Sequence, residues 1–373
     1  MKLEVSVDKL KNAVALASRI VGKNLSLPIL STILFKVSGK LLNIRSTNLS
    51  LGIEIEIPAK VSKEGVVAVS GDILNNIFSN INQNTVTLES LQGNILINSK
   101  NSNILVKSLP AEDFPTIPSV SGKTFNINSN ILINGIKSVH WSALVSDIKP
   151  EISSVYMWSE NGQLVFVATD SFRLAEKRIK TKNQEEIPGI ILPFRNVVEI
   201  IRIFDGLDGE IKISYNKNQI SFSCNGIYVT SRLIDGIYPD YRQIIPKEKT
   251  TETIVLKQDF LSALKIAGVF SGKFNQISLI ARPREKNFFI NSKSAEVGEN
   301  HTRVDAALSG ENIEVNLNLK YLMDCLPAIS DDSIVIRFNG ADKPILARGV
   351  SDSSFTYLIM PISPSKSETK TEK

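Results

Sequence analysis

The chain has 373 residues, too many for one ordinary domain of about 100–150 residues, and its 42% hydrophobic and 22% charged residues are typical of a folded globular protein. Its two cysteines exclude a disulfide framework or a four-cysteine zinc site, and its two histidines exclude most histidine-rich metal centres. Apolar runs fall short of the about 18 residues that a membrane helix needs, and charged residues interrupt the N-terminus where a signal peptide is apolar. We therefore expect a cytoplasmic protein with no metal or cofactor and no membrane partner. The net charge of +5 permits a polyanionic partner.

Amphipathic periodicity predicts helices of two kinds along the chain. The stretches 5–21, 127–144 and 256–270 each read as a strand-like entry, a polar cap and an amphipathic helix. A second kind of helix also occurs three times and follows a strand and a capping position. Its predicted starts are Ser70, Pro193 and Asn318, and successive starts lie close to one third of the chain apart. This spacing indicates an internal repeat.

Strand patterns recur with the same period. Residues 51–57 alternate apolar and polar side chains, as a half-buried strand does. Three clusters of three strands each, with turn residues between them, begin near residues 85, 210 and 333. We predict an α+β chain made of three tandem copies of a two-helix, two-sheet unit. The predicted domains are 1–119, 120–247 and 248–362, followed by a polar and disordered tail, 363–373.

Catalytic motifs are absent from the sequence. The segment 268–274 is one residue short of a phosphate-binding loop, and it ends in Phe274 where such a loop has serine or threonine. His140, Cys224 and Cys325 lie among apolar residues and are typical of packed side chains. The sequence therefore gives no support for an enzyme.

Three segments nevertheless carry residues beyond what a scaffold needs. They are 167–175 with its Thr-Asp-Ser-Phe-Arg turn, the aromatic and proline-rich 235–246, and the very apolar 357–362. Each alone is also compatible with a tight turn, a linker or a buried strand. Together with SLPIL (26–30) and LPAEDFP (109–115), the segments ATDSFRLA (168–175), DGIYPDYR (235–242) and YLIMP (357–361) make the chain resemble the bacterial replicative sliding clamp, the beta subunit of DNA polymerase III.

The resemblance implies the DNA clamp fold, in which two chains close head to tail into a ring of six units with helices inside and sheets outside. Such a homodimer encircles double-stranded DNA without reading its sequence and tethers the replicative polymerase. The clamp loader and other proteins with a clamp-binding motif would be further partners. The role implied is that of a non-catalytic processivity subunit, in keeping with the absence of catalytic motifs.

DNA-facing residues are expected on the helices, because a sliding ring needs contacts to phosphates and not to base edges. Lys23 and Arg195 match positions where the family places basic residues. The helix prediction adds Lys9, Lys11, Arg202, Lys137 and Lys265. The predicted helix 71–81 departs from the family pattern, since it contains no lysine or arginine.

Partner proteins of the family dock short peptides that carry leucine and an aromatic residue, in a pocket between the second and third repeats. The resemblance places its apolar floor at Ile152, Thr169, Leu174, Pro239, Ile244, Leu358 and Met360. Phe172 and Arg173 would form a wall, with Ser171 in the turn. Asn318, Tyr321, Pro344 and Ile362 would flank a neighbouring subsite, and Gln243 stands where some relatives carry arginine.

The resemblance also places the dimer interface. An edge strand around Asn103–Lys107 would face the helix around Ala263–Phe270 of the other chain, with Ile104 and Val106 opposite Val269. An alternative from another class is a monomeric β-rich binding or adhesion module with no role on DNA. Exposed clusters of aromatic residues and a signal peptide would favour that module, and the sequence carries neither.

Overall fold

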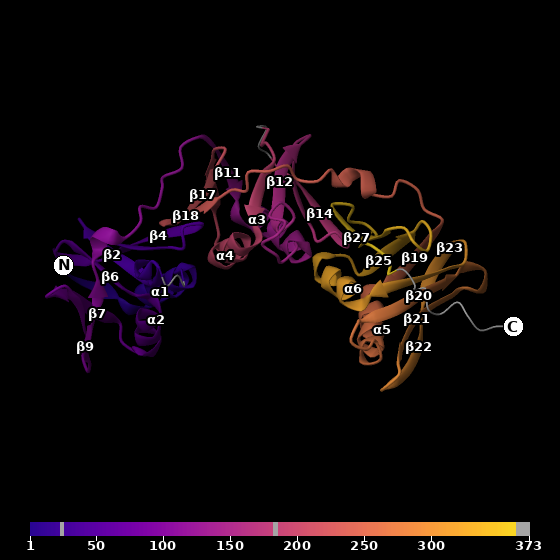
Figure 1. The fold of residues 1–373 in the computed structure, drawn as a ribbon, viewed down its shortest axis with the longest axis horizontal. Helices are drawn as coiled ribbons and strands as arrows, with labels where there is room; N and C mark the ends of the chain where they lie inside the picture. Colours follow the sequence, from indigo (N-terminus) through magenta and orange to yellow (C-terminus); the bar gives the residue numbers. More distant parts are fainter. Residues whose placement is uncertain (23–25, 182–185, 363–373) are drawn as a thin grey trace. The chain divides into compact units, whose positions relative to one another are not determined.

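The computed structural model describes residues 1–22, 26–181 and 186–362 of the chain (Figure 1). The described residues form two compact groups, which are considered separately. The first group comprises Met1–Ile133 with Arg195–Asp235, and the second comprises Asn134–Phe194 with Gly236 onward. No helix in the described part of the chain is long and apolar enough to cross a membrane.

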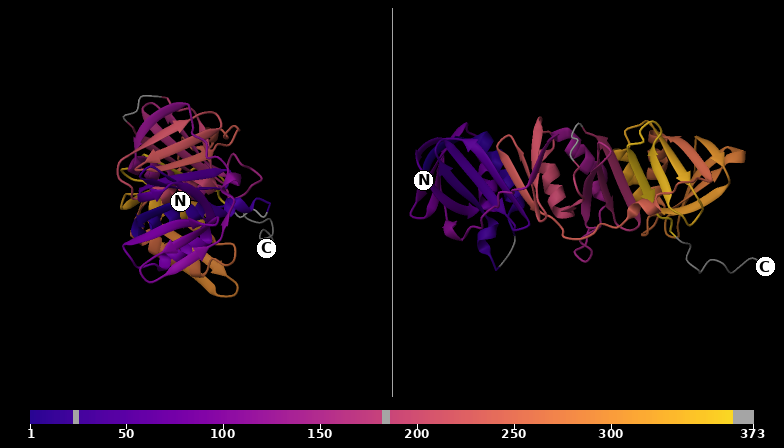
Figure 2. Two further views of the ribbon diagram at one scale, coloured as in Figure 1. Left: turned by 90° about the vertical axis from the view of Figure 1, so that its left-hand side faces the viewer. Right: turned by 90° about the horizontal axis from the view of Figure 1, so that it is seen from above.

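The first group contains two antiparallel sheets. The smaller has the order β5 (Lys60–Lys63), β1 (Lys2–Ser6), β7 (Thr85–Leu91), β8 (Asn94–Asn98) and β9 (Asn103–Val106). The larger has the order β10 (Ser108–Leu109), β6 (Gly65–Ser70), β2 (Thr32–Ser38), β3 (Leu41–Thr47), β4 (Leu51–Pro58), β18 (Ile227–Arg232), β17 (Gln219–Cys224), β16 (Glu210–Tyr215) and β11 (Lys123–Asn128). Strands far apart in sequence meet where β4 pairs with β18, seen as the indigo and salmon neighbours in Figure 2.

Helices cover one side of these strands. Helix α1 (Val7–Ile20) buries Leu10, Val14 and Ala17 against β3 and β4 and lies beside α2 (Gly71–Asn80). Helix α4 (Phe194–Phe204) is held to the larger sheet by Asn196, whose amide donates hydrogen bonds to Ser50 and Ser231. Buried apolar area of this kind is the main stabilising contribution in such a fold.

The second group repeats this plan. Its large antiparallel sheet has the order β15 (Ile190–Pro193), β12 (Ser154–Glu160), β13 (Gln163–Thr169), β14 (Arg173–Lys180), β27 (Phe355–Ile359), β26 (Ile345–Gly349), β25 (Ser333–Phe338), β19 (Thr251–Leu256) and β23 (Ala306–Gly310). Its small sheet has the order β22 (Gly298–Val304), β21 (Asn287–Ser294), β20 (Gln276–Arg282) and β24 (Ile313–Asn318). Helices α5 (Lys257–Val269) and α6 (Leu319–Cys325) contact each other (Figure 1).

Helix α3 (Ser129–Val139) begins in the first group and ends in the second. The described residues also form short 3-10 helices: η1 (Pro28–Ser31), η2 (Ala111–Asp113), η3 (His140–Ser142), η4 (Tyr241–Ile244), η5 (Pro283–Glu285) and η6 (Leu326–Ala328). Two of them mark where helices end. The helix in the predicted stretch 127–144 ends at Val139 and is followed by η3. The helix that starts after Asn318 ends at Cys325 and tightens into η6, because Pro327 cannot continue an α-helix.

Most of the predicted elements are confirmed. Helices α2, α4 and α6 begin directly after Ser70, Pro193 and Asn318, and the three strand clusters lie where the sequence placed them. The middle third of the chain gives β11 and β16–β18 to one large sheet and β12–β15 to the other, so compact groups do not follow the repeat. The domain limits at 119, 247 and 362 therefore stay a prediction, and the tail 363–373 lies outside the described residues.

Candidate peptide-docking surface

A tight turn joins β13 to β14 and presents a phenylalanine to solvent. The Asp170 carboxylate accepts hydrogen bonds at 3.0 Å from the backbone N–H groups of Phe172 and Arg173. The Thr169 hydroxyl donates to the Arg173 carbonyl at 2.6 Å, and Ser171 adopts a left-handed φ of 78°. Phe172 is 61% exposed as a result. Asp, Thr and Ser support such turns because their short side chains bond to neighbouring backbone groups.

Arg173 lies under this turn, and its part in a wall of the pocket stays a prediction. Its guanidinium donates to Asp170 at 2.9 Å, to Asp324 at 2.6 Å and to the Trp141 carbonyl at 2.9 Å. It also stacks over the ring of Tyr321, with its central carbon 4.6 Å from the ring centroid. Only 10% of the side chain is exposed. Arg173 thus connects the turn to η3 and α6.

The charge on Arg173 is secure in this setting. Burial alone lowers the pKa of a guanidinium, but the hydrogen bond to Asp324, together with the negative charge and hydrogen bond of Asp170, helps to raise the pKa of Arg173 above its ordinary value. Because arginine offers a planar fork of donors, it can satisfy two carboxylates and a carbonyl at once.

One face of the large sheet collects apolar residues from separate segments. Thr169 pairs with Leu174 across β13 and β14, and Leu174 pairs with Leu358 across β14 and β27. Residues directly opposite in an antiparallel pair point to the same face. Leu174 and Leu358 are only 1% and 2% exposed. They therefore form a floor and not a free surface.

The end of β27 extends this face. The N–H of Met360 donates to the Phe172 carbonyl at 2.8 Å, and the Met360 side chain is 36% exposed. Ile345 pairs with Ile359, so one step further along the same register Pro344 lies opposite Met360. Ile362 follows, and its N–H donates to the Asn316 carbonyl at 2.8 Å.

The linker before β19 covers the same face. Tyr238 stacks on Tyr156 with ring centroids 4.6 Å apart, and the hydroxyl of Tyr241 donates to the carboxylate of Glu176. Glu176 lies two residues after Leu174 on β14 and hence on its face. Burial, and next the negative charge of Glu176, raise the pKa of Tyr241, which keeps this donor protonated.

These contacts bring the linker residues Pro239 and Ile244 to the sheet face that holds Leu174 and Leu358. Ile244 is 48% exposed and Pro239 is also exposed. We call the set Thr169, Leu174, Pro239, Ile244, Leu358 and Met360 the docking surface. Gln243 in the same segment points back to Asp240, to which its amide donates at 2.7 Å.

The other predicted pocket residues lie at the margins of the docking surface. The Leu144 N–H donates to the carbonyls of both Ile152 and Thr169, at 3.1 and 3.2 Å, so Ile152 adjoins the floor and is 7% exposed. Asn318 caps α6, its side chain accepting from the Lys320 N–H at 2.9 Å. That amide oxygen is therefore already engaged.

The predicted DNA-facing residues lie on helices of both groups. Lys9, Lys11, Arg195, Arg202 and Lys265 are exposed, whereas Lys137 is half-buried. The Lys11 ammonium donates to the Ser79 carbonyl at the end of α2, at 3.3 Å, and Arg202 pairs with Glu199 at 2.5 Å. Lys23 lies outside the described residues.

The residues predicted for the dimer interface differ in how far they are exposed to solvent. Strand β9 is the last strand of its sheet, as expected, but Val106 is buried within the chain, with 6% exposed. The exposed side chain of this edge is Leu105, at 56%. Val269 is 62% exposed at the end of α5, near the exposed Phe274.

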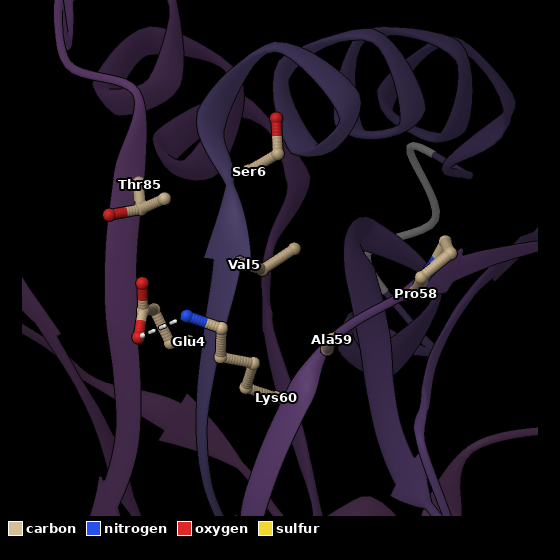
Figure 3. A pocket seen from close by; sticks show the side chains of 7 residues that line it. All are labelled: Glu4, Val5, Ser6, Pro58, Ala59, Lys60 and Thr85. Atoms are coloured by element: carbon tan, nitrogen blue, oxygen red, sulfur yellow. Dashed lines mark ion pairs between the residues drawn. The ribbon is translucent and has the colours of Figure 1, made fainter.

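Hollows in the structure lie elsewhere. One, of about 290 Å³, is lined by residues of β1, β5 and β7 and is crossed by an ion pair between Lys60 and Glu4 at 3.6 Å (Figure 3). Its polar groups are exposed to solvent, so the hollow is not a preformed binding site. Within residues 1–22, 26–181 and 186–362, His, Cys, Asp and Glu side chains do not gather as three or more potential metal ligands.

Sequence profiles of three protein domains match this chain. They describe the N-terminal, central and C-terminal domains of the DNA polymerase III beta subunit and match residues 1–118, 126–240 and 242–363. The chain belongs to the DNA polymerase III beta subunit family. This family comprises sliding clamps, which are non-catalytic processivity factors. The sliding-clamp function predicted from the sequence is therefore confirmed, and the adhesion module is not supported.

Individual relatives agree over nearly the whole chain. The beta sliding clamps of Synechococcus elongatus and Bacillus subtilis are 28% and 26% identical, each over 97% of this chain and 99% of the relative. Crystal structures of the Thermotoga maritima beta subunit and the Bacillus subtilis sliding clamp superpose with TM-scores of 0.92 and 0.93, at 25% and 26% identity. Both superpositions cover 98% of this chain and 100% of the other. The three-domain clamp fold is thus confirmed.

Several residues that hold the docking region together were not predicted from the sequence. Asp324, Trp141 and Glu176 hold Arg173 and Tyr241, yet each lies far from its partner in sequence. The spacing of Asp170 and Arg173 was a usable local signal for the turn. The partners that α6 and the linker supply, Asp324 and Tyr241, are known only from the strand pairing in the folded structure.

Replacing Asp324 by alanine should loosen the turn. Arg173 would lose its shortest hydrogen bond, and we expect the unfolding free energy to fall by about 1.5–3 kcal/mol, as for hydrogen bonds to charged groups. The measurement is urea unfolding followed by Trp141 fluorescence in a Trp158→Phe background. The exposed Asp332→Ala serves as the matched control. A change below about 0.5 kcal/mol, the scale of an ordinary surface substitution, would contradict the role given to Asp324.

Proposed function

We propose that this chain works as a ring-shaped homodimer that encircles double-stranded DNA, with its helices facing the duplex, and tethers the replicative polymerase. The clamp loader and other motif-bearing proteins would dock on the same surface, in the bacterial cytoplasm. The observation that carries this proposal is the match of all three clamp domains along the chain. A topological role of this kind needs no reacting group.

Two open apolar edges support the homodimer. Strand β9 ends its sheet with Leu105 exposed, and an unpaired edge of this kind favours pairing with another chain. The C-terminal end of α5 exposes Val269, with Phe274 at 83% five residues further on. Val297, at 59%, precedes Gly298, where an added Cβ would lie 3.6 Å from the Phe270 ring. Basic Lys107 flanks the first edge. At the second, Glu299 is paired with Lys293 at 3.8 Å and Lys273 adjoins Phe274, so the two surfaces match in apolar character.

A charge in this seam should separate the two chains. Leu105→Glu combined with Val269→Glu would bury repelling carboxylates, and we expect a folded monomer in sedimentation at micromolar concentration. Val106→Glu is the contrasting variant, because burial of that side chain within β9 predicts misfolding instead. A double variant that remains dimeric would place the seam elsewhere.

DNA contact should be weak, salt-dependent and independent of sequence. Exposed Lys9 and Arg195 would meet phosphates, so Lys9→Gln with Arg195→Gln should shorten retention on nicked circular DNA. The slope of log affinity against log salt should fall by about 2, roughly one for each lost phosphate contact. Lys36→Gln, on strand β2, is the control. Equal retention on linear and circular DNA would contradict encirclement.

The docking surface should bind a partner peptide through leucine and an aromatic residue. Met360→Ala with Ile244→Ser removes two exposed walls and leaves the buried floor intact. We expect the affinity of a fluorescent peptide carrying both residues to fall at least tenfold, about 1.4 kcal/mol. The exposed Val350→Ser should leave affinity unchanged. Unchanged binding in the double variant would remove peptide docking from this surface.

A further inference from the structure

Three aliphatic side chains beside the docking surface have almost no cover. Val145 is 75%, Ile148 is 88% and Ile237 is 91% exposed. We call these three residues the apolar rim. A single exposed isoleucine is ordinary, but neighbouring exposed aliphatic residues mark interaction sites.

The two segments that carry the apolar rim are neighbours. A Cβ atom placed on Gly236 would lie 3.0 Å from Cγ of Glu151, so residue 237 begins next to the 145–151 loop. Hydrogen bonds fix that loop. The Ser153 N–H donates to the Lys149 carbonyl at 3.0 Å, the Ser153 hydroxyl donates to the Ser146 carbonyl, and the Ile148 N–H donates to the Ser146 hydroxyl at 3.2 Å.

The apolar rim is continuous with the docking surface at both segments. Val145 follows Leu144, whose N–H joins the carbonyls of Ile152 and Thr169 at the floor. Ile237 precedes by two residues Pro239 of the docking surface. An extended peptide leaving the docking surface on this side would therefore run onto the rim.

Acidic groups surround the apolar rim. Glu151 lies in the loop, and Asp240 follows Ile237 in the linker. Against these two carboxylates stands Lys149, so the summed charge of these groups is negative. The nearby Arg242 is paired with Glu160 at 3.1 Å and does not offset it. A cationic segment complements such a surface and a neutral or anionic segment does not.

We propose that the apolar rim and its carboxylates form a second subsite that binds the flank of a partner peptide, in which an aliphatic residue stands next to lysine or arginine. The aliphatic residue covers Ile148 and Ile237, and the cation lies by Glu151 and Asp240. The proposal rests on the peptide-docking function above. It adds a specificity that the docking surface alone does not provide, since that surface selects only leucine and an aromatic residue.

Fluorescence anisotropy with seven peptides tests this subsite on the full-length protein. One peptide is a short core with leucine and phenylalanine. The others carry four further residues, Lys-Leu-Lys-Ser, Glu-Leu-Glu-Ser or Ser-Ser-Ser-Ser, each made at either end of the core. Four extended residues reach about 13 Å, more than the about 7 Å that the two residues from Pro239 back to Ile237 can span. We expect the lysine flank at one end to bind at least fivefold more tightly than the serine flank at low salt, and the glutamate flank to bind less tightly.

Variants separate the apolar contribution of the second subsite from its electrostatic contribution. Ile148→Ser with Ile237→Ser should abolish the gain of the lysine flank and leave the core peptide unchanged. Glu151→Gln with Asp240→Asn should remove the salt-dependent part of the gain, whereas Asp208→Asn should not. A lysine flank no better than serine, or a gain that survives Ile148→Ser with Ile237→Ser, would overturn the second subsite. Failure of the core peptide itself would instead overturn the docking function.

Discussion

A buried guanidinium holds together the parts from which the docking surface is built. Arg173 joins the β13–β14 turn, η3 and α6 through Asp170, Trp141 and Asp324. Removing a partner from such a group leaves a charge without compensation at low dielectric, which costs more than the contact itself contributes. The exposed position of Phe172 and the bond from Met360 to the Phe172 carbonyl both depend on that turn. The hydrogen bonds of Arg173 therefore fix the positions of the apolar residues Phe172 and Met360.

The face of these strands that holds Leu174 also holds a second polar anchor. Glu176 is 5% exposed and accepts from Tyr241 and from Arg178, which also pairs with Glu160. Arg242 reaches Glu160 as well and lies over the ring of Trp158, 5.4 Å from its centroid. The linker is thus held by charge-assisted hydrogen bonds and stacking at its middle, while Pro239 and Ile244 on either side stay exposed. A peptide can use those side chains because other residues bind the linker to the sheet.

The sequence predicted secondary structure correctly where the local pattern was strong. Helix starts after Ser70, Pro193 and Asn318 follow from capping positions and apolar periodicity, both of which act within a few residues. The Arg173–Asp324 contact depends on the pairing of β14 with β27, which no local pattern specifies.

The proposed seam shows a different limit of prediction from sequence. Ile104, Leu105 and Val106 are all apolar, so their order has no period of two and cannot show which side chain faces the core. The resemblance placed the strand, and only the sheet register separated buried Val106 from exposed Leu105.

Exposed aliphatic and aromatic side chains lie where partners are proposed, and this distribution follows from what a clamp must do. Leu105 and Val269 stand at the two edges of the proposed seam, and Phe172 and Met360 stand at the docking surface. An isolated chain with these groups in water is prone to association, because each exposed strand edge or patch offers apolar area to any neighbour. Closure of a ring would cover the seam permanently, whereas the docking surface has to stay open for exchange of partners. The floor residues Leu174 and Leu358 are already buried in the single chain, so a departing partner uncovers only exposed side chains such as Met360 and Ile244 and not the core of the sheet.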